Sequence, residues 1–202
     1  MKRIKTILLD MDGIVVDFVS SWCQKYNEIT GESLKNDDKI GWDIADVAKY
    51  PEVLYDLIDL PDAFFDPEPF PDAIKYIKQL QKDGLEIVFL TTAPSTADFA
   101  VRDKRRWIEK YLPDFNIKNV IYCHRKDLVN GDILIDDRPK NVEAWRRSHA
   151  DGLTAAILYS PKANNPPKVD WLFENPETAW AEIYEKITEH NKAYSPSADY
   201  YW

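Results

Sequence analysis

The sequence contains little cysteine and no long hydrophobic stretch. Only two of its 202 residues are cysteines, Cys23 and Cys123, and they are too far apart for the close spacing typical of a metal site. The apolar run after Lys2 and Arg3 is interrupted by Asp10, so it is too short for a signal peptide or a membrane span. We therefore expect a cytoplasmic protein with reduced thiols and no membrane contact.

Positive charge is also scarce. The chain has 26 Lys and Arg residues against 35 Asp and Glu, which gives a formal net charge of −9. This balance excludes the broad basic surface that binds duplex DNA, but a small anion could still bind at a local site that contains a metal. Aromatic residues are abundant at 13%, and their rings either fill cores or stack on other rings.

Short apolar runs alternate with helical patterns along the chain. Five runs are typical of strands buried on both faces, at residues 7–9, 85–91, 119–123, 132–135 and 153–158. Helices are predicted at residues 17–29, 72–82, 96–112, 141–149 and 176–190, with two short ones at 42–49 and 51–60. This alternation predicts an α/β fold with a doubly wound parallel sheet.

The connection between the first two predicted strands is unusually long. It spans roughly residues 13–70, whereas one crossover helix needs about a dozen residues or slightly more. We therefore predict a helical cap inserted after the first strand. The expected division is an α/β core at 1–16 and 71–190, the cap at 17–70 and a C-terminal tail at 191–202. The aromatic end of the tail leaves two options, docking on a second copy in a homodimer or folding back on its own chain.

Polar residues with catalytic chemistry stand at the carboxyl ends of the predicted strands: Asp10 with Asp12, Thr92, Lys126, and Asp136 with Asp137. Because these ends meet at one edge of a parallel sheet, we expect the side chains to converge there. Carboxylates bind Mg²⁺ and can attack phosphorus, while a hydroxyl and an ammonium can hold phosphoryl oxygens. Each residue alone is typical of a solvated turn, but the whole set in this order favours phosphoryl transfer.

The strings LLDMDG, FLTT and LIDD, with Lys126 between the last two, resemble the four motifs of the haloacid dehalogenase superfamily of phosphatases. Four longer strings are similar to the 5'(3')-deoxyribonucleotidase family over roughly residues 4–145: DMDGIVVDF, FFDPEPFPDA, TTAP and RKDLVNGDILIDDRP. The resemblance implies a HAD-like fold. It also implies a Mg²⁺-dependent phosphatase that hydrolyses nucleoside monophosphates to nucleoside and phosphate through an aspartyl-phosphate intermediate.

The same resemblance implies roles for single residues. Asp10 would be the nucleophile and a Mg²⁺ ligand, and Asp12 the general acid/base, whose backbone carbonyl also reaches the metal. Lys126, together with Thr92, would bind phosphate. In the acid pair that follows, Asp137 is expected to ligate the metal, while Asp136 helps through water or orientation.

Three further positions concern the substrate. Phe18 occupies a position that lines the substrate pocket in the family, and Trp42 could either stack on a base or pack the cap onto the core. Ala93 stands where the family commonly has a serine on the phosphate side. One hydroxyl is therefore missing there, unless Thr91 or Ser95 replaces it.

Two alternative functions remain open from the sequence. One is a related phosphatase for another small phosphate ester or for a nucleic-acid 3'-phosphate end. The other is a non-catalytic phospho-aspartate regulatory module, which groups the same residue types but in a different order along the chain.

A basic stretch in the helix predicted at 96–112 also allows two interpretations. Arg102, Lys104, Arg105 and Arg106 could attract an anion, but acidic residues stand nearby. We expect a solvated helix face.

Overall fold

The centre of the fold is a parallel sheet. Within residues 2–157 and 168–194, which the computed structural model describes, six strands form one sheet in the order β3-β2-β1-β4-β5-β6. The strands are β1 (Thr6–Leu9), β2 (Glu86–Thr91), β3 (Val120–Tyr122), β4 (Ile133–Ile135), β5 (Leu153–Ile157) and β6 (Trp171–Phe173). All neighbouring pairs are parallel, which confirms the predicted α/β fold.

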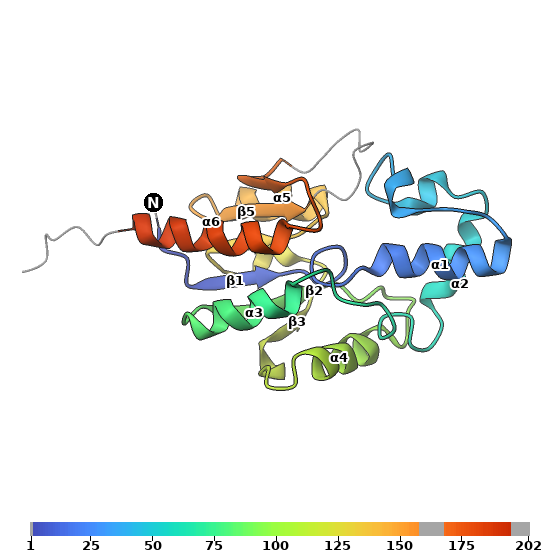
Figure 1. The fold of residues 1–202 in the computed structure, drawn as a ribbon, viewed down its shortest axis with the longest axis horizontal. Helices are drawn as coiled ribbons and strands as arrows, with labels where there is room; N and C mark the ends of the chain where they lie inside the picture. Colours follow the sequence, from blue (N-terminus) through green and yellow to red (C-terminus); the bar gives the residue numbers. More distant parts are fainter. Residues whose placement is uncertain (1, 158–167, 195–202) are drawn as a thin grey trace, which may run out of the picture.

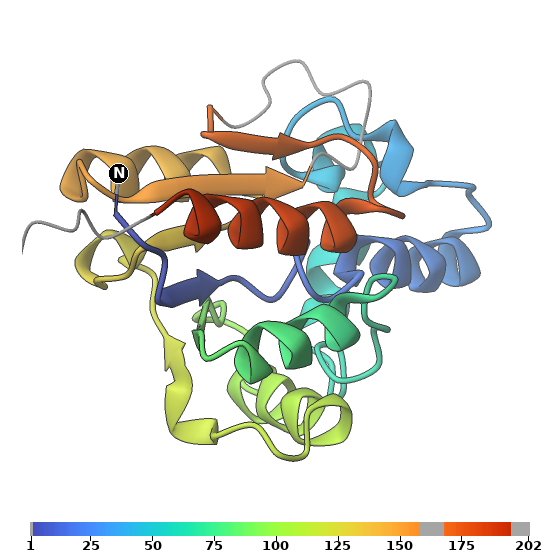
Figure 2. The same ribbon diagram turned by 60° about the vertical axis from the view of Figure 1, so that its left-hand side comes forward.

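Helices cover the sheet and extend beyond its carboxyl edge (Figures 1 and 2). They are α1 (Phe18–Thr30), α2 (Pro51–Ile58), α3 (Ala73–Lys82), α4 (Ala100–Tyr111), α5 (Pro139–Ser148) and α6 (Ala179–Ala193). Short 3₁₀ turns are η1 (Asn36–Asp38), η2 (Ile44–Val47), η3 (Ile117–Asn119) and η4 (Lys126–Leu128). No described helix is both long and apolar enough to cross a membrane.

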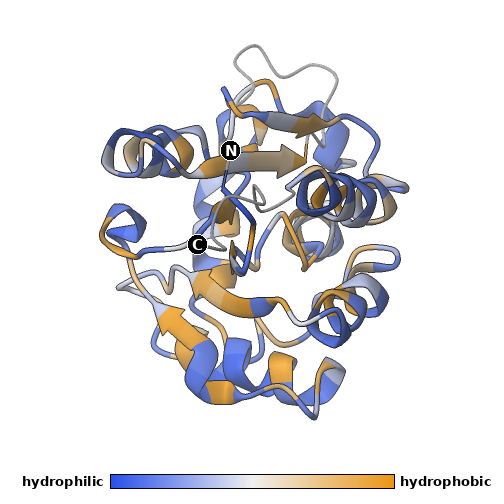
Figure 3. Ribbon diagram, turned by 90° about the vertical axis from the view of Figure 1, so that its left-hand side faces the viewer, coloured by the Kyte–Doolittle hydropathy of each residue, from blue (hydrophilic) through white to orange (hydrophobic). Residues whose placement is uncertain are grey.

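The strand β1 is buried on both faces, which explains its unbroken apolar run. Ile7 and Leu9 belong to the main hydrophobic core with residues of α3 and α6, while Leu8 packs with Trp145 of α5 on the opposite face. Figure 3 shows most strands as hydrophobic and the helices as mixed, as expected when helices bury one side only. Because β1 pairs with both β2 and β4, its carboxyl end lies in the middle of the sheet edge.

Helix α6 holds β1 and its flanking residues at two places. The Asn191 side chain accepts a hydrogen bond from the Ile4 N–H at 2.8 Å and donates one to the Ile4 carbonyl at 2.9 Å. The Trp180 indole donates to the carbonyl of Ile14, just beyond the strand, at 3.0 Å. The last described helix therefore binds the backbone on both sides of the first strand.

Some predicted elements need correction. The strand β6 was not predicted, because three residues are too few to reveal a period. The helix expected from residue 96 begins at Ala100, and the one expected at 42–49 is the 3₁₀ turn η2. Helix α6 includes the first three residues of the predicted tail, 191–193. Residues 195–202, on which the homodimer option rests, lie outside the described residues.

The residues predicted as the cap surround a small hydrophobic cluster of their own. Its buried members come from α1, η2 and α2: Cys23, Tyr26, Ile44, Ala45, Leu54 and Leu57. In Figure 1 α1 and α2 lie beyond the carboxyl ends of the strands, on the side to which β1 points. The boundaries of the core and the cap stay a prediction.

Candidate active site

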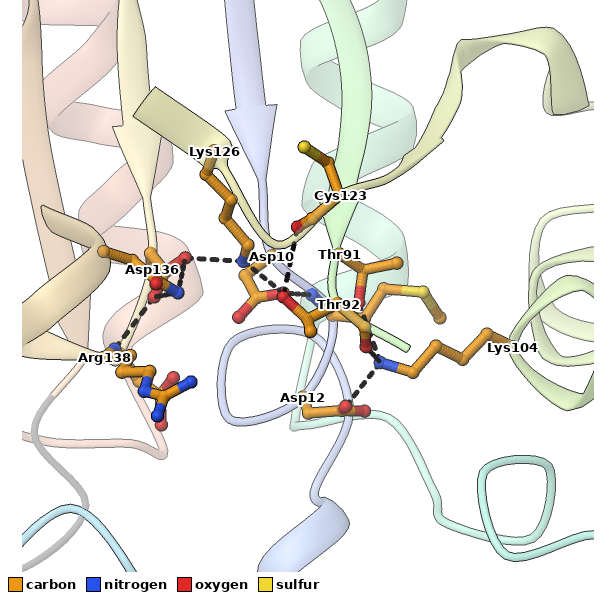
Figure 4. A network of polar contacts seen from close by, with 12 residues as sticks. Asp10, Asp12, Thr91, Thr92, Lys104, Cys123, Lys126, Asp136 and Arg138 are labelled. Carbon is orange, nitrogen blue, oxygen red and sulfur yellow. Dashed lines mark hydrogen bonds and ion pairs between the residues drawn. The ribbon is translucent and has the colours of Figure 1, made fainter. Parts of the chain in front are cut away.

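A tight turn after β1 separates the two acids of the first motif. The backbone N–H groups of residues 14–16 all donate to the Met11 carbonyl, at 3.2, 2.8 and 2.9 Å, and Gly13 has a φ of 76°. Glycine adopts this left-handed conformation without the strain that a side chain would bring. As Figure 4 shows, Asp10 points toward Lys126 and Asp12 points the other way. The two carboxylates can therefore have different tasks.

Asp10 and Asp136 share one buried cation, Lys126. The ammonium lies 2.8 Å from Asp10 Oδ1 and 2.6 Å from Asp136 Oδ2. Burial alone would lower the pKa of Lys126, but the two carboxylates outweigh it and raise the pKa. A permanent positive charge thus lies directly behind the Asp10 carboxylate.

The acid pair after β4 occupies two different environments. Asp136 is fully buried and accepts hydrogen bonds from Lys126, from the Arg138 N–H at 2.9 Å and from the Asn141 amide at 3.1 Å. Asp137 is only partly buried and lines the cavity described below. Asp136 is therefore held by protein groups, whereas Asp137 faces open space.

Charge also distinguishes Asp137. Burial raises the pKa of its carboxyl to about 7, the positive charge of Lys39 opposes this shift, and the neighbouring Asp136 adds to it. The Trp42 indole N–H donates to Asp137 Oδ2 at 3.1 Å. A carboxylate crowded by other acids is stabilised by any added cation.

Three carboxylates converge in a way that suits a metal ion. Asp10, Asp136 and Asp137 each offer an oxygen, and these atoms all lie within 4.8 Å of one another. Gly13 leaves room for Asp137, since a Cβ atom at residue 13 would lie 2.6 Å from its Oδ2. Oxygen donors of this kind fit a hard divalent cation. The Asp12 side chain is not in this cluster.

Asp12 has its own cation, Lys104, which the sequence did not identify. The Lys104 ammonium lies 2.5 Å from Asp12 Oδ2 and donates to the Thr91 hydroxyl at 2.8 Å and the Thr92 carbonyl at 2.9 Å. Burial raises the pKa of Asp12, which Lys104 opposes and Asp10 reinforces. A raised pKa favours a carboxyl that carries a proton and then gives it up.

The predicted solvated face of α4 is wrong for Lys104, which is only 1% exposed. The sequence did contain an indication that Lys104 is buried. Residues 100, 104, 107 and 108 are spaced to share one helix face, and all of them except Lys104 are apolar. The other three basic residues of this stretch are exposed or partly exposed, which is closer to the predicted solvated face. Arg102 and Arg106 both bind Asp62, and Arg105 pairs with Glu109 on the exposed surface at 2.9 Å.

Thr92 and Ala93 follow β2 at the same edge. The Thr92 hydroxyl donates to the Cys123 carbonyl at 3.2 Å, and Thr92 lines the cavity. Ala93 packs against a small cluster that includes Phe64, and it is not among the described residues that line the cavity. Thr91 is buried and bound to Lys104, and Ser95 is exposed.

A cavity of about 250 Å³ lies between the acids and the predicted cap. Its aromatic wall includes Phe18, which stacks on Phe64 with ring centres 4.9 Å apart and planes at 12°. Trp42 also lines it, and the Arg138 guanidinium lies 4.2 Å from the centre of the Trp42 ring. The cavity therefore combines an acidic end with flat apolar surfaces suited to stacking on a ring.

Comparison with known proteins gives one matching family model. It is described as "5' nucleotidase, deoxy (Pyrimidine), cytosolic type C protein" and matches residues 3–192.

Two relatives agree with this match, and one solved structure is similar in fold alone. A 5'(3')-deoxyribonucleotidase of Clostridium acetobutylicum is 33% identical over 145 residues, covering 70% of this chain and 77% of that protein. One of Bacillus subtilis is 30% identical over 141 residues, covering 70% and 80%. A HAD family hydrolase of Deinococcus radiodurans has a TM-score of 0.54 at 10% identity, covering 90% and 96%, and is similar in fold.

Proposed function

Because this chain belongs to the 5'(3')-deoxyribonucleotidase family of the haloacid dehalogenase superfamily, we propose that Asp10 removes phosphate from deoxyribonucleoside monophosphates. The protein is thus a phosphoric monoester hydrolase rather than a regulatory phospho-aspartate module. The proposal is carried by one observation: Asp10 and Asp12 line the same cavity, and a different buried lysine lies beside each, Lys126 and Lys104. The description of the family model as cytosolic supports the expected cytoplasmic location.

The acidic cluster supports Mg²⁺ as the cofactor. Asp10 and Asp137 would hold the ion, with the Asp12 backbone carbonyl as a further ligand, while Asp136 orients Lys126. Bound there, the cation would neutralise charge on the phosphoryl oxygens.

The first half of the reaction is assigned to both acids. A carboxylate oxygen of Asp10 attacks phosphorus, and the bond from phosphorus to the sugar oxygen breaks. Asp12 gives its proton to that oxygen, so the nucleoside leaves as a neutral alcohol. Lys126 and Thr92 hold phosphoryl oxygens as charge redistributes.

The second half regenerates the enzyme. Asp12 is now a carboxylate and takes a proton from a water molecule, whose oxygen attacks the phosphorus of the aspartyl-phosphate. The bond from phosphorus to Asp10 breaks, and inorganic phosphate and the Asp10 carboxylate are released. Lys104 is a positioning residue here, since it holds Asp12 and does not line the cavity.

The proposal is tested with a substrate panel. The wild-type protein is incubated with 5'- and 3'-deoxyribonucleoside monophosphates, sugar phosphates and a 3'-phosphorylated oligonucleotide, and released phosphate is measured. We expect release from the nucleotides, loss of release with a chelator and recovery with added Mg²⁺. Faster release from the oligonucleotide or the sugar phosphates than from every nucleotide would contradict the proposed substrate class.

Lys104→Met is expected to lower kcat by about 10- to 100-fold with a smaller change in KM, because Asp12 loses a charged hydrogen bond that orients it. The measurement is steady-state phosphate release from the best nucleotide. Lys110→Met, which changes an exposed lysine of the same helix, is the control. An unchanged kcat in Lys104→Met would show that Asp12 does not depend on this contact.

A further inference from the structure

A tight turn at residues 62–66 lies between α2 and α3, in the predicted cap. The Asp62 carbonyl closes it by accepting hydrogen bonds from the N–H groups of Phe65 and Asp66, both at 3.0 Å. Asp62 has a φ of 66°, in the left-handed region that aspartate and asparagine adopt more readily than most side chains. In Figure 1 the segment after α2 runs between α1 and α4, and Asp66 pairs with Lys25 of α1 at 2.8 Å.

The Asp62 side chain binds the turn to α4. Its Oδ1 accepts hydrogen bonds from the guanidinium groups of Arg102, at 3.4 Å, and of Arg106. Arg102 also donates through Nε and Nη2 to the buried Asp103 carboxylate, at 2.9 and 2.7 Å, and the Arg106 guanidinium lies 4.0 Å from the centre of the Phe65 ring. Isolated exposed ion pairs contribute little, but here other contacts already orient both arginines toward Asp62.

The same turn supplies part of the aromatic wall of the cavity. Phe64 is 4% exposed and lines the cavity, whereas Asp62, two residues earlier, does not. The Phe64 ring stacks on Phe18 of α1, and the Lys104 ammonium of α4 lies 5.1 Å from its centre. The place of this stacked pair of rings therefore depends on where the turn lies against α4.

Helix α4 holds the chain on both sides of Phe64. On the carboxyl side, the Trp107 indole donates to the Pro67 carbonyl at 2.7 Å, and this contact is buried. On the amino side, the contact with α4 is the one made by Asp62. Without Asp62, Phe64 would keep its anchor toward α3 but lose the one toward α2.

We propose that Asp62 is a positioning residue for recognition of the nucleoside part of the substrate, acting through Phe64. The inference rests on the proposed function and deepens it. With the phosphoryl group at Asp10, the nucleoside extends along the rest of the cavity, whose wall includes the Phe18 and Phe64 rings. Flat rings of this kind stack on a base. Asp10 and Asp12 are held by other residues, so a shift of the turn should weaken nucleoside binding more than bond cleavage.

The proposal has a consequence that a purely stabilising role would not share. Inorganic phosphate has no nucleoside, so its binding should not depend on the position of Phe64. Loss of Asp62 should therefore weaken binding of the nucleotide and leave binding of phosphate unchanged. General destabilisation would lower the unfolding temperature without separating the two ligands.

Asp62→Asn is the main test variant, because asparagine also adopts the left-handed conformation and the change removes only the charge. Asp62→Gly, in parallel, keeps that backbone conformation and removes the side chain. Asp59→Asn is the matched control, since Asp59 is exposed, stands three residues earlier and does not line the cavity. Phe64→Leu, alone and combined with Asp62→Asn, tests the route through the ring. At saturating Mg²⁺, kcat and KM are measured with the best nucleotide, and inorganic phosphate is measured as a competitive inhibitor.

We expect Asp62→Asn and Asp62→Gly to raise KM about fivefold, with kcat and phosphate inhibition within about twofold of wild type. In the Phe64→Leu background, Asp62→Asn should raise KM by less than about twofold, because the residue through which it acts is gone. A KM within about twofold of wild type in both Asp62 variants, equal weakening of phosphate, or additive effects in the double variant would overturn the proposal. Failure of the wild-type protein to hydrolyse any nucleotide would instead refute the proposed function.

Discussion

Asp10→Asn is expected to reduce phosphate release by at least about 10⁴-fold while the protein stays folded. The amide keeps the size of the carboxylate, so the packing after β1 is preserved, but it cannot attack phosphorus as a carboxylate does. Lys126 keeps the Asp136 carboxylate as a partner at 2.6 Å, so its charge is not left unpaired. Asp10→Asn should therefore lose phosphate release without losing stability.

The measurement is phosphate release from the best nucleotide at saturating Mg²⁺, with thermal unfolding of the same samples. Asp114→Asn is the control, because Asp114 is exposed and lies far along the chain from the acidic cluster. Wild-type turnover in Asp10→Asn would exclude Asp10 as the nucleophile. A variant that unfolds at low temperature would instead indicate that Asp10 holds the fold.

Lys126→Met is expected to destabilise the protein by about 3–5 kcal/mol in addition to lowering activity. Lys126 is 2% exposed and is the shared cation of Asp10 and Asp136, so its removal leaves two carboxylates close together without their cation. Methionine fills a similar volume, so the change tests charge rather than packing.

The free energy of unfolding is measured in urea with and without Mg²⁺. We expect the metal to restore part of the lost stability in Lys126→Met, because it would supply positive charge to the same carboxylates. Lys118→Met, at an exposed lysine, should unfold like the wild type. A loss below about 1 kcal/mol would mean that the acids do not need Lys126 in the folded protein.

The order of elements and the acidic edge could be predicted because both depend on local patterns of consecutive residues. An apolar run that ends in Asp10 shows strand and carboxylate together, and parallel strands bring their carboxyl ends to one edge. The same holds for Lys126 and Asp136, whose positions after their strands were enough to bring them together.

What the sequence missed depends on distant contacts. Lys104 looked like part of a charged helix surface because its neighbours are charged, and only the path of α4 brings it 2.5 Å from Asp12. Trp42 was a candidate, but it lies in a region without strong periodicity, and its contact with Asp137, which the sequence did not indicate, spans 95 residues of chain. No local pattern specifies how a segment of this kind approaches the edge of the sheet.

The two contacts of α6 with the first strand bear on how the protein is made. Translation releases β1 first, but its flanking backbone groups at Ile4 and Ile14 meet their α6 partners 187 and 166 residues later. The contact between α6 and the turn that separates Asp10 from Asp12 can thus form only after Trp180 has left the ribosome. A nascent chain that stops before Trp180 would carry all of the predicted catalytic residues but would lack the indole that binds the Ile14 carbonyl. The proposed catalytic competence should therefore appear only after α6 has been synthesised.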